Sequence, residues 1–472
     1  MIIMQKLTKQ ILEQISPTET DRAKVEAITR LIEQKVALAC KEEGVPAVVR
    51  VEGSVAKDTW LREDPDIDIF MRLPTELPRK DLGAIGLRIA RKAAAGYEQI
   101  ERFAEHPYLQ IIVEGYRVDI VPCYNSREGE WQSATDRTPY HTDYIKKHLT
   151  AGLRGEVRLL KKFMQATGVY GAEIKVGGFS GYLCELLIMK HGAFSETIEA
   201  FAHYKRRITI DIRDYYAERQ NELRLLFPEP LVIVDPVDKG RNVASAVQHD
   251  KLYGLVAAAR AFQQAPSEAY FNPPKTKQYS TKKMKTQLET RGSSIVFLAV
   301  GQVPAVPDVL WGQLYRTKRS LSKLIELSDF RLLKDAVWSN EKNLSIFIFE
   351  LEQQVLPNVK KHLGPPLERE PECASFLSKY VGNQKVISGP FVEDGRWVAM
   401  LPRKTTNVVD LLQEKLAGGG KNAGVADLIA GSIRKSLKVL VNGEISGVCA
   451  KNGDFAVFLT EYLVGKPFWL RA

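Results

Sequence analysis

Apolar and polar residues in the first 150 positions follow a helical spacing and then a strand spacing. Ser16, Pro17 and Glu19 have the order of a helix start, with an N-cap, a proline in the first turn and a capping box. Apolar residues continue on one helical face until Gly44, a residue type that commonly ends helices. Short β-prone runs follow at residues 47–51, 67–71, 109–113 and 116–121. This succession predicts a mixed α/β domain over residues 1–150.

From residue 151 onward the spacing changes again. Helical runs at 156–166, 180–190 and 244–263 predict a helical neck over residues 151–272, followed by a linker rich in proline. Beyond the linker, the pattern predicts a strand, a helix and two strands in that order, at 294–300, 310–327, 331–338 and 344–352. This order predicts an α+β body and tail of the ferredoxin-like type over residues 273–472, with another helical run at 423–441.

Composition narrows the class of protein. A chain of 472 residues with 44% hydrophobic residues is long enough for several domains, and no apolar run reaches the ~18 residues of a membrane span. The five cysteines are scattered and form no Cys-x-x-Cys pair, which is typical of a reduced compartment. We therefore expect a cytoplasmic protein that makes no contact with membranes.

The excess of positive charge is concentrated in one segment. The chain carries a formal charge of +10, and residues 273–323 contain ten basic side chains against two acidic ones. Tyr279 and Tyr315 lie between them, where aromatic rings could stack on bases. This pattern favours an RNA-binding surface over a merely solvated face. The candidate RNA contacts are Lys282, Lys283, Lys285, Lys318 and Arg319.

Candidate chemistry begins at a Gly53-Ser54 turn that is followed by Asp66-Ile67-Asp68. Residues two apart in a strand share a face, so Asp66 and Asp68 would present two carboxylates side by side. Adjacent negative charges repel unless a cation lies between them, and Mg²⁺ prefers oxygen ligands of this kind. Backbone N–H groups at a glycine turn can also approach a phosphate closely.

A third acid, Asp119, lies in the apolar strand pattern at residues 116–121. Burying an acid without a partner costs free energy. We therefore expect the strand of Asp119 to lie beside the strand of Asp66 and Asp68, where the three acids can share metal ions. Three carboxylates around two Mg²⁺ ions form a site for nucleotidyl transfer, in which one ion activates a hydroxyl and the other neutralises pyrophosphate.

These features resemble the polymerase-β nucleotidyltransferase superfamily, and longer strings resemble its archaeal class I branch, the CCA-adding tRNA nucleotidyltransferases. The strings occur in order over 195 residues: GSVAKDTWL (53–61), DIDIF (66–70), EHPY (105–108), EGYRVDIVPCY (114–124), DRTPYHTDY (136–144), RLLKKFMQATGVYGAE (158–173), GFSGYLCELLI (178–188) and DPVDKGRNVASAV (235–247).

The resemblance implies a polymerase-β-like head, tRNA as the RNA partner, CTP and ATP as substrates, two Mg²⁺ ions and a possible homodimer. It implies roles for six further residues: Ser54 and Lys57 at the triphosphate, His141, Lys161 and Tyr170 at the incoming nucleotide, and Arg241 at the base. The chain departs from some relatives by having Asp66 where they have glutamate. It also has His141-Thr142 where they have two histidines, so either residue could contact the nucleotide.

Other interpretations remain open from the sequence. A poly(A) polymerase of the same superfamily would share the carboxylates, and an inactive RNA-binding protein could share the fold. Three intact acids argue against the inactive protein, because a dead site has no physical reason to keep them together. Arg241 could also serve only to pair with Asp235 or Asp238 and shape the turn between them.

Overall fold

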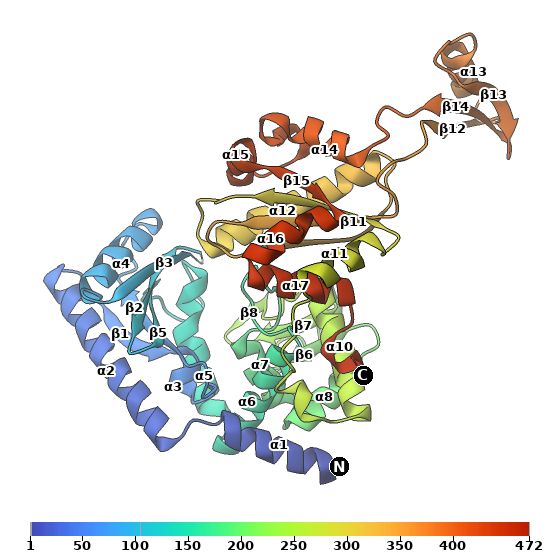
Figure 1. The fold of residues 1–472 in the computed structure, drawn as a ribbon. Helices are drawn as coiled ribbons and strands as arrows, with labels where there is room; N and C mark the ends of the chain where they lie inside the picture. The colour runs from blue at the N-terminus through green and yellow to red at the C-terminus, as the bar shows by residue number, and fades with distance from the viewer. Residues whose placement is uncertain (1, 104, 472) are drawn as a thin grey trace. The chain divides into compact units, whose positions relative to one another are not determined.

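The computed structural model describes residues 2–103 and 105–471, which form two compact units (Figure 1). The first unit contains the residues up to 275, together with 306–309 and the C-terminal segment from 466. The second unit contains residues 276–305 and 310–465. The division between head and neck at residue 150 stays a prediction, because both belong to the first unit.

The head is built on a five-stranded sheet with the order β1-β2-β5-β4-β3. The pairing of β2 with β5 is parallel, and the other pairings are antiparallel. Helices α2 (Glu19–Glu42) and α4 (Arg79–Ala93) pack against the sheet and enclose the head core (Figure 1). The predicted α/β pattern is therefore confirmed. The strands are β1 (Val48–Glu52), β2 (Asp66–Leu73), β3 (Glu98–Phe103), β4 (Pro107–Val113) and β5 (Tyr116–Tyr124).

The predicted N-cap of the first long helix, and the acid predicted to complete its capping box, are wrong. Ser16 ends a preceding helix, α1 (Ile2–Ile15), because its N–H donates to the carbonyl of Leu12 at 3.0 Å. The N-cap of α2 is Thr18, whose hydroxyl accepts from the N–H of Asp21 at 3.2 Å. The Asp21 carboxylate accepts from the Thr18 N–H at 2.9 Å, so aspartate completes the capping box in place of the expected Glu19.

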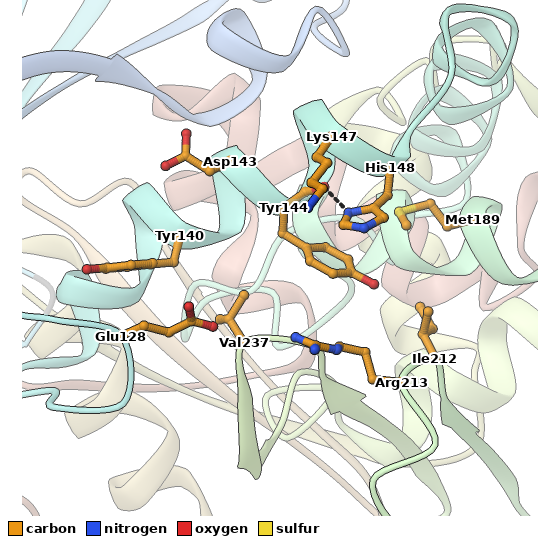
Figure 2. A pocket seen from close by; sticks show the side chains of 10 residues that line it. All are labelled: Glu128, Tyr140, Asp143, Tyr144, Lys147, His148, Met189, Ile212, Arg213 and Val237. Atoms are coloured by element: carbon orange, nitrogen blue, oxygen red, sulfur yellow. Dashed lines mark hydrogen bonds between the residues drawn. The ribbon is translucent and has the colours of Figure 1, made fainter.

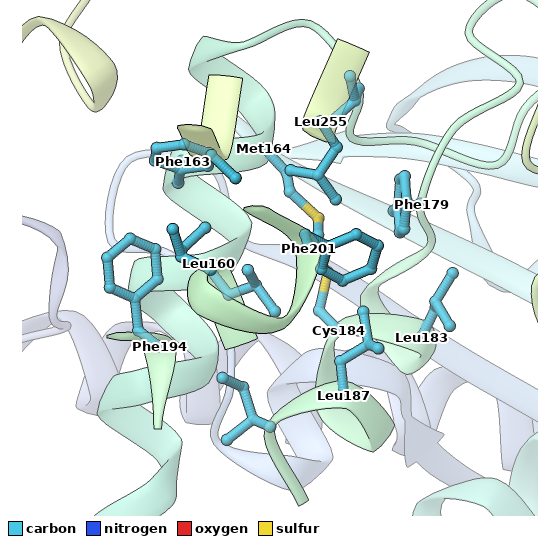
Figure 3. Packing of buried hydrophobic residues seen from close by; sticks show 14 of the residues in the cluster. Leu160, Phe163, Met164, Phe179, Leu183, Cys184, Leu187, Phe194, Phe201 and Leu255 are labelled. Atoms are coloured by element: carbon cyan, nitrogen blue, oxygen red, sulfur yellow. The ribbon is translucent and has the colours of Figure 1, made fainter. Parts of the chain in front are cut away.

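The neck is a helical bundle around a large apolar core that includes Phe163 and Phe194 (Figure 3). Phe163, Phe194 and Phe262 meet edge to face. The C-terminal Phe468 and Trp469 pack against Tyr270 at the edge of this core. Its helices are α6 (Ala151–Ala166), α7 (Gly181–His191), α8 (Phe194–Ala202), α9 (Gln220–Leu226) and α10 (His249–Gln264). Helix α5 (Thr138–His148), the last of the head, packs against the same core through Ile145.

The neck is not wholly helical as predicted, because it also contains a small sheet of order β6-β7-β8. Its strands are β6 (Ile208–Asp211), β7 (Leu231–Asp235) and β8 (Asp238–Asn242). The strands are short, and β8 is polar, so neither period 2 nor a long apolar run marks them in the sequence. This sheet matters because β7 and β8 carry Asp235 and Arg241.

Head and neck are joined through Asp58, which follows the short helix α3 (Gly53–Lys57) with a left-handed backbone at φ 53°. Its carboxylate pairs with Arg158 at 2.6 Å and Arg154 at 3.2 Å on the neck helix α6, and with Arg22 on α2. The carboxylate therefore anchors the end of α3 to α6.

The second unit has a four-stranded sheet of order β10-β11-β9-β15, in which every pairing is antiparallel. This is the strand order of the ferredoxin-like fold, as predicted. The run at 423–441 is helical only in part, since it divides into α15 (Asp427–Ser436) and β15 (Lys438–Val441), which pairs with β9. The other elements are α11 (Thr281–Glu289), β9 (Ser294–Val300), α12 (Pro307–Leu327), β10 (Leu332–Ser339), β11 (Ser345–Leu351), α14 (Val408–Leu416), α16 (Ser446–Lys451) and α17 (Gly453–Val464).

The tail is inserted into this fold between β11 and α14. It is a three-stranded sheet of order β12-β14-β13, with one helix packed on it. Its elements are β12 (Val359–Pro366), α13 (Glu370–Tyr380), β13 (Ser388–Glu393) and β14 (Arg396–Pro402). Across the described part of the chain, no helix is both long enough and apolar enough for a membrane crossing.

Candidate active site

The three aspartates occupy neighbouring strands of the head sheet. β2 and β5 run parallel, and their register sets Asp68 directly beside Asp119. Ile67 and Ile69 are fully buried in the head core, so Asp66 and Asp68 project from the opposite face. Burial raises the pKa of Asp68 well above its usual range, and the charges of Asp119 and Asp66 raise it further. The predicted neighbouring strands are confirmed, while the catalytic roles remain a prediction.

Two of these carboxylates also have protein partners. Asp66 pairs with Arg117 at 2.8 Å, and Asp119 accepts a hydrogen bond from the Gln110 amide at 2.8 Å. Within residues 2–103 and 105–471, no three acidic, histidine or cysteine side chains are gathered into a ready-made metal site. The donor set nevertheless suits a divalent ion, because it consists of carboxylate oxygens whose mutual repulsion a cation would relieve.

Gly53 makes room for one of these carboxylates. It connects β1 to α3 with φ +66°, and a Cβ at this position would lie 2.0 Å from Oδ2 of Asp68. Both the backbone angle and the close approach therefore require glycine here. Ser54 follows it in α3, on the segment that also carries Lys57.

Lys57 and Lys161 converge on one buried carboxylate. The Lys57 ammonium lies 2.6 Å from Oε2 of Glu185, which is fully buried on α7. The Thr59 hydroxyl donates to the other oxygen of Glu185 at 2.6 Å. Lys161 donates to the carbonyl and hydroxyl of Thr59 at 3.0 and 3.1 Å, and lies 3.9 Å from Glu185. Glu185 is therefore the shared counter-ion of the two lysines predicted to contact nucleotide.

Tyr170 and Lys161 lie close to each other over Gly181. The Tyr170 hydroxyl and the Lys161 ammonium lie 3.1 and 3.4 Å from the position that a Cβ on Gly181 would take. A larger residue at the start of α7 would therefore crowd both groups. Burial raises the pKa of Tyr170 well above its usual range, and Cys184 and Glu185 act in the same direction, so the phenol is a neutral hydrogen-bond donor.

Asp235 gathers three further side chains. Its Oδ2 lies 2.9 Å from Nε2 of His141 and 2.7 Å from Nη1 of Arg241, while Oδ1 accepts from the Tyr182 hydroxyl at 3.1 Å. The ring of His141 stacks on that of Tyr182 with centroids 4.1 Å apart. Burial alone would raise the pKa of Asp235, but the hydrogen bond and charge of His141 and the charge of Arg241 lower it to about 2. The pairing of Arg241 with Asp235 that the sequence left open does occur.

These groups lie within electrostatic reach of one another. Lys57 lowers the pKa of Asp68 against the stronger effects of burial and neighbouring acids, and it contributes to the lowered pKa of His141, which burial dominates. Thr142 is buried on α5 beside His141, so the structure does not separate the two candidates for the nucleotide contact.

Sequence reasoning missed Glu185, Tyr182 and Asp235 as members of the site. One signal was available for Glu185, which is the only acid in an otherwise apolar helix over residues 180–190. A buried acid requires a partner, and the partner here is a lysine that is distant in sequence. Two partners of Asp235, His141 and Tyr182, could not be inferred, because they lie on α5 and α7, far from β7 in the chain.

The basic side chains of residues 273–323 do not all lie on one surface of the second unit. Met284 of α11 packs with Phe297 on one face of the β9 sheet, whereas Leu314 of α12 packs with Val296 and Leu298 on the other face. The segment is therefore divided between the two sides of the sheet. Lys282, Lys283 and Lys285 are exposed on α11, while on α12 Lys318 is paired with Asp335 and Arg319 is exposed.

Three family models match successive parts of the chain. They are the nucleotidyltransferase domain at residues 33–149, the tRNA nucleotidyltransferase second domain at 155–272, and the CCA-adding enzyme C-terminal domain at 291–442. Together they match most of the chain, and in the order that the resemblance implies.

Curated relatives match over nearly the full length. The CCA-adding enzyme of Methanosarcina barkeri is 36% identical over 98% of this chain and 99% of its own, and that of Methanosarcina mazei is 37% identical over the same shares. The solved structure of E. coli MS115-1 CdnC with ATP is 19% identical, covers 57% of this chain and 93% of its own, and has a TM-score of 0.44. On the full-length relatives and the family models, the chain belongs to the archaeal class I CCA-adding enzymes, a family of nucleotidyltransferases.

Proposed function

We propose that this enzyme adds CMP, CMP and AMP from CTP and ATP to the 3′ end of tRNA, using Asp66, Asp68 and Asp119 to hold two Mg²⁺ ions. CCA addition follows from the family, and neither a poly(A) polymerase nor an inactive RNA-binding protein is favoured by the full-length relatives. The observation that supports this site is the register of Asp68 with Asp119, beside an aspartate on the same face.

The reaction requires a polar, positively charged environment around the triphosphate. When bound, the two ions would supply charge for activation of the tRNA 3′-hydroxyl and for departure of pyrophosphate. Asp66, Asp68 and Asp119 would hold them through oxygen donors of the type that Mg²⁺ prefers. Gly53 keeps the space beside Asp68 open for its carboxylate.

Ser54 and Lys57 would bind and orient the triphosphate, and Lys161 and Tyr170 would contact the incoming nucleotide beside it. Lysine ammonium groups and a neutral phenol are donors, and phosphate oxygens accept from both. Glu185 positions the two lysines, because its carboxylate lies 2.6 Å from Lys57 and 3.9 Å from Lys161. Nucleotidyl transfer depends mainly on such positioning and charge stabilisation, so no separate protein base is needed.

Arg241 would recognise the base. Its planar fork of donors can meet acceptors on a base edge, and one donor is held by Asp235 at 2.7 Å. Asp235 is ionised at neutral pH, because its pKa is about 2, so it fixes the guanidinium strongly. His141 shares the same carboxylate and stacks on Tyr182, which ties α5 to this arrangement.

Lys282, Lys283, Lys285, Lys318 and Arg319 are proposed to contact tRNA phosphates. We also propose that the enzyme works in the cytoplasm as a homodimer, as the family resemblance implies. The cysteines support a reducing compartment, since all five are free and buried.

The site is tested by comparing Asp119→Asn with the matched control Asp64→Asn, because Asp64 is a nearby acid that pairs with Arg117 outside the proposed set. Purified protein is incubated with tRNA lacking its terminus, Mg²⁺ and each labelled nucleotide. We expect Asp119→Asn to lose more than about a hundredfold in rate, several kcal/mol of transition-state stabilisation, while Asp64→Asn stays near wild type. Equal rates for the two variants would contradict the assignment.

A further inference from the structure

A cavity lies beside helix α5, next to the group of side chains around Asp235. It has a volume of about 610 Å³ and is lined by residues of α5 and α7, Glu128, the segment after β6 and the turn between β7 and β8 (Figure 2). No residue of the proposed active site lines it. Its size would admit a group as large as one nucleotide.

Helix α5 contributes side chains both to this cavity and to the candidate active site. His141 is buried against Asp235, whereas Tyr140, Tyr144 and Lys147 line the cavity. The opposite wall includes Val237, whose N–H donates to the Asp235 carboxylate at 3.1 Å. The cavity and the site at Arg241 therefore share both α5 and the β7–β8 turn.

The cavity offers an aromatic and apolar surface for a flat ring. The rings of Tyr144 and His148 lie 4.3 Å apart at 31°, and the His148 ring is fixed by a 2.8 Å hydrogen bond to the Tyr144 carbonyl. Figure 2 shows Tyr144 projecting into the space between α5 and the opposite wall, with Met189 and Ile212 beside it. A nucleobase can stack on such a surface regardless of its identity.

The charged groups of the cavity suit a phosphate and a base amine. Arg213 and Lys147 supply two cations, and Arg213 is held by the Pro236 carbonyl at 3.3 Å. Asp143 is already neutralised by Arg50, at 2.6 Å. Glu128 lies at the opposite end of the cavity from His148 in Figure 2, where its carboxylate could accept from an exocyclic amine.

We propose that this cavity binds one unpaired ribonucleotide, with its base against Tyr144 and its phosphate at Lys147 and Arg213. The inference rests on the proposed function, because that function supplies both RNA and free nucleotide. Either source has the same chemistry: a nucleotide within the RNA substrate, or a free CTP or ATP molecule. Occupation would stiffen the β7–β8 turn, which belongs to the same hairpin as the arginine proposed to read the incoming base.

The test measures binding separately from catalysis. The variants are Tyr144→Leu, which keeps an apolar side chain but removes the ring, and Lys147→Gln on the exposed surface of α5. Lys146→Gln is the matched control, since Lys146 is exposed on the same helix but does not line the cavity. The probes are a single-stranded RNA hexamer that carries 2-aminopurine, followed by its fluorescence, and free ATP or CTP, followed by calorimetry without RNA.

If RNA is the source, both variants weaken hexamer binding about tenfold and reduce the quenching of 2-aminopurine, while Lys146→Gln leaves both unchanged. If a free nucleotide is the source, a second and weaker calorimetric binding step is lost in both variants and hexamer binding is unchanged. The proposal is overturned if Lys147→Gln changes neither probe by more than twofold. Wild-type protein that binds the hexamer but does not extend tRNA would contradict the proposed function alone.

Discussion

Replacing Glu185 by glutamine tests whether a buried counter-ion organises the triphosphate site. Glu185 is fully buried and has close contacts to Lys57, Thr59 and Lys161 at 2.6, 2.6 and 3.9 Å. Glutamine keeps the shape but removes the negative charge, and leaves two buried ammonium groups together. Breaking a buried pair in this way typically costs about 3–5 kcal/mol of folding stability.

The functional effect follows from the protonation of Lys161. Burial already lowers the pKa of Lys161, Glu185 opposes that shift, and Lys57 reinforces it. Removing the Glu185 charge lowers the pKa further, so Lys161 loses its proton at a lower pH than in the wild type. Loss of one charged hydrogen bond to phosphate is worth about 1.5–3 kcal/mol, which is roughly a ten- to hundredfold fall in kcat/KM for CTP.

The assay is the pH dependence of kcat/KM for CTP on tRNA lacking its terminus, together with inhibition by inorganic tripolyphosphate. We expect the alkaline limb of the Glu185→Gln profile to move to lower pH and inhibition by tripolyphosphate to weaken. Glu199→Gln, an exposed acid on α8, serves as the control for handling and stability. Tighter tripolyphosphate binding would refute the reasoning, because it would mean that Glu185 merely competes with phosphate for the lysines. An unmoved alkaline limb in a less stable protein would show a purely structural role.

Three other variants test further proposed contacts, two at the active site and one in the basic segment. Gly53→Ala should lose most activity in the tRNA extension assay, because its Cβ would lie 2.0 Å from the Asp68 carboxylate; activity near wild type would show that the carboxylate can move freely. Arg241→Lys keeps the charge but loses the fork, so discrimination against UTP and GTP should fall roughly ten- to a hundredfold in a competition assay. Equal selectivity with lower stability would mean that Arg241 only pairs with Asp235. Neutralising Lys282, Lys283 and Lys285 together should reduce the slope of log K against log salt for tRNA by up to about three units, whereas an unchanged slope would mean that they are merely solvated.

The strands that carry the three acids could be predicted because the sequence itself alternates. Ile67 and Ile69 are buried and flank Asp68, so period 2 places the acids on the other face. The capping box of α2 could not be resolved, because Ser16 and Thr18 are both common N-caps. The hydrogen bonds decide between them, since the Ser16 N–H donates to the Leu12 carbonyl and Thr18 caps α2 with Asp21.

The elements and site residues that the sequence did not predict depend on tertiary contacts. β15 directly follows the helical residues of α15 and lies within the same predicted helical run, although it forms an edge strand beside β9. Glu185 and Asp235 become site residues only when α7, α5 and the β7–β8 hairpin come together. Their partners are separated by up to 128 residues in the chain, so no local pattern could reveal them.

The two chain segments that connect the tail to the body lie side by side, and this affects how the tail can change in evolution. The two connecting segments lie against each other, with an antiparallel bridge between Val355 and Asn407 and a 2.8 Å hydrogen bond from the Leu356 N–H to the Thr406 carbonyl. The tail also has its own small apolar cluster around Phe376, Tyr380 and Ala399. Because its two ends are already adjacent, the module between them can be shortened, exchanged or lost without rethreading the body sheet, as insertions at such sites generally permit. Evolution can therefore change the size and sequence of this lobe while the body sheet stays the same.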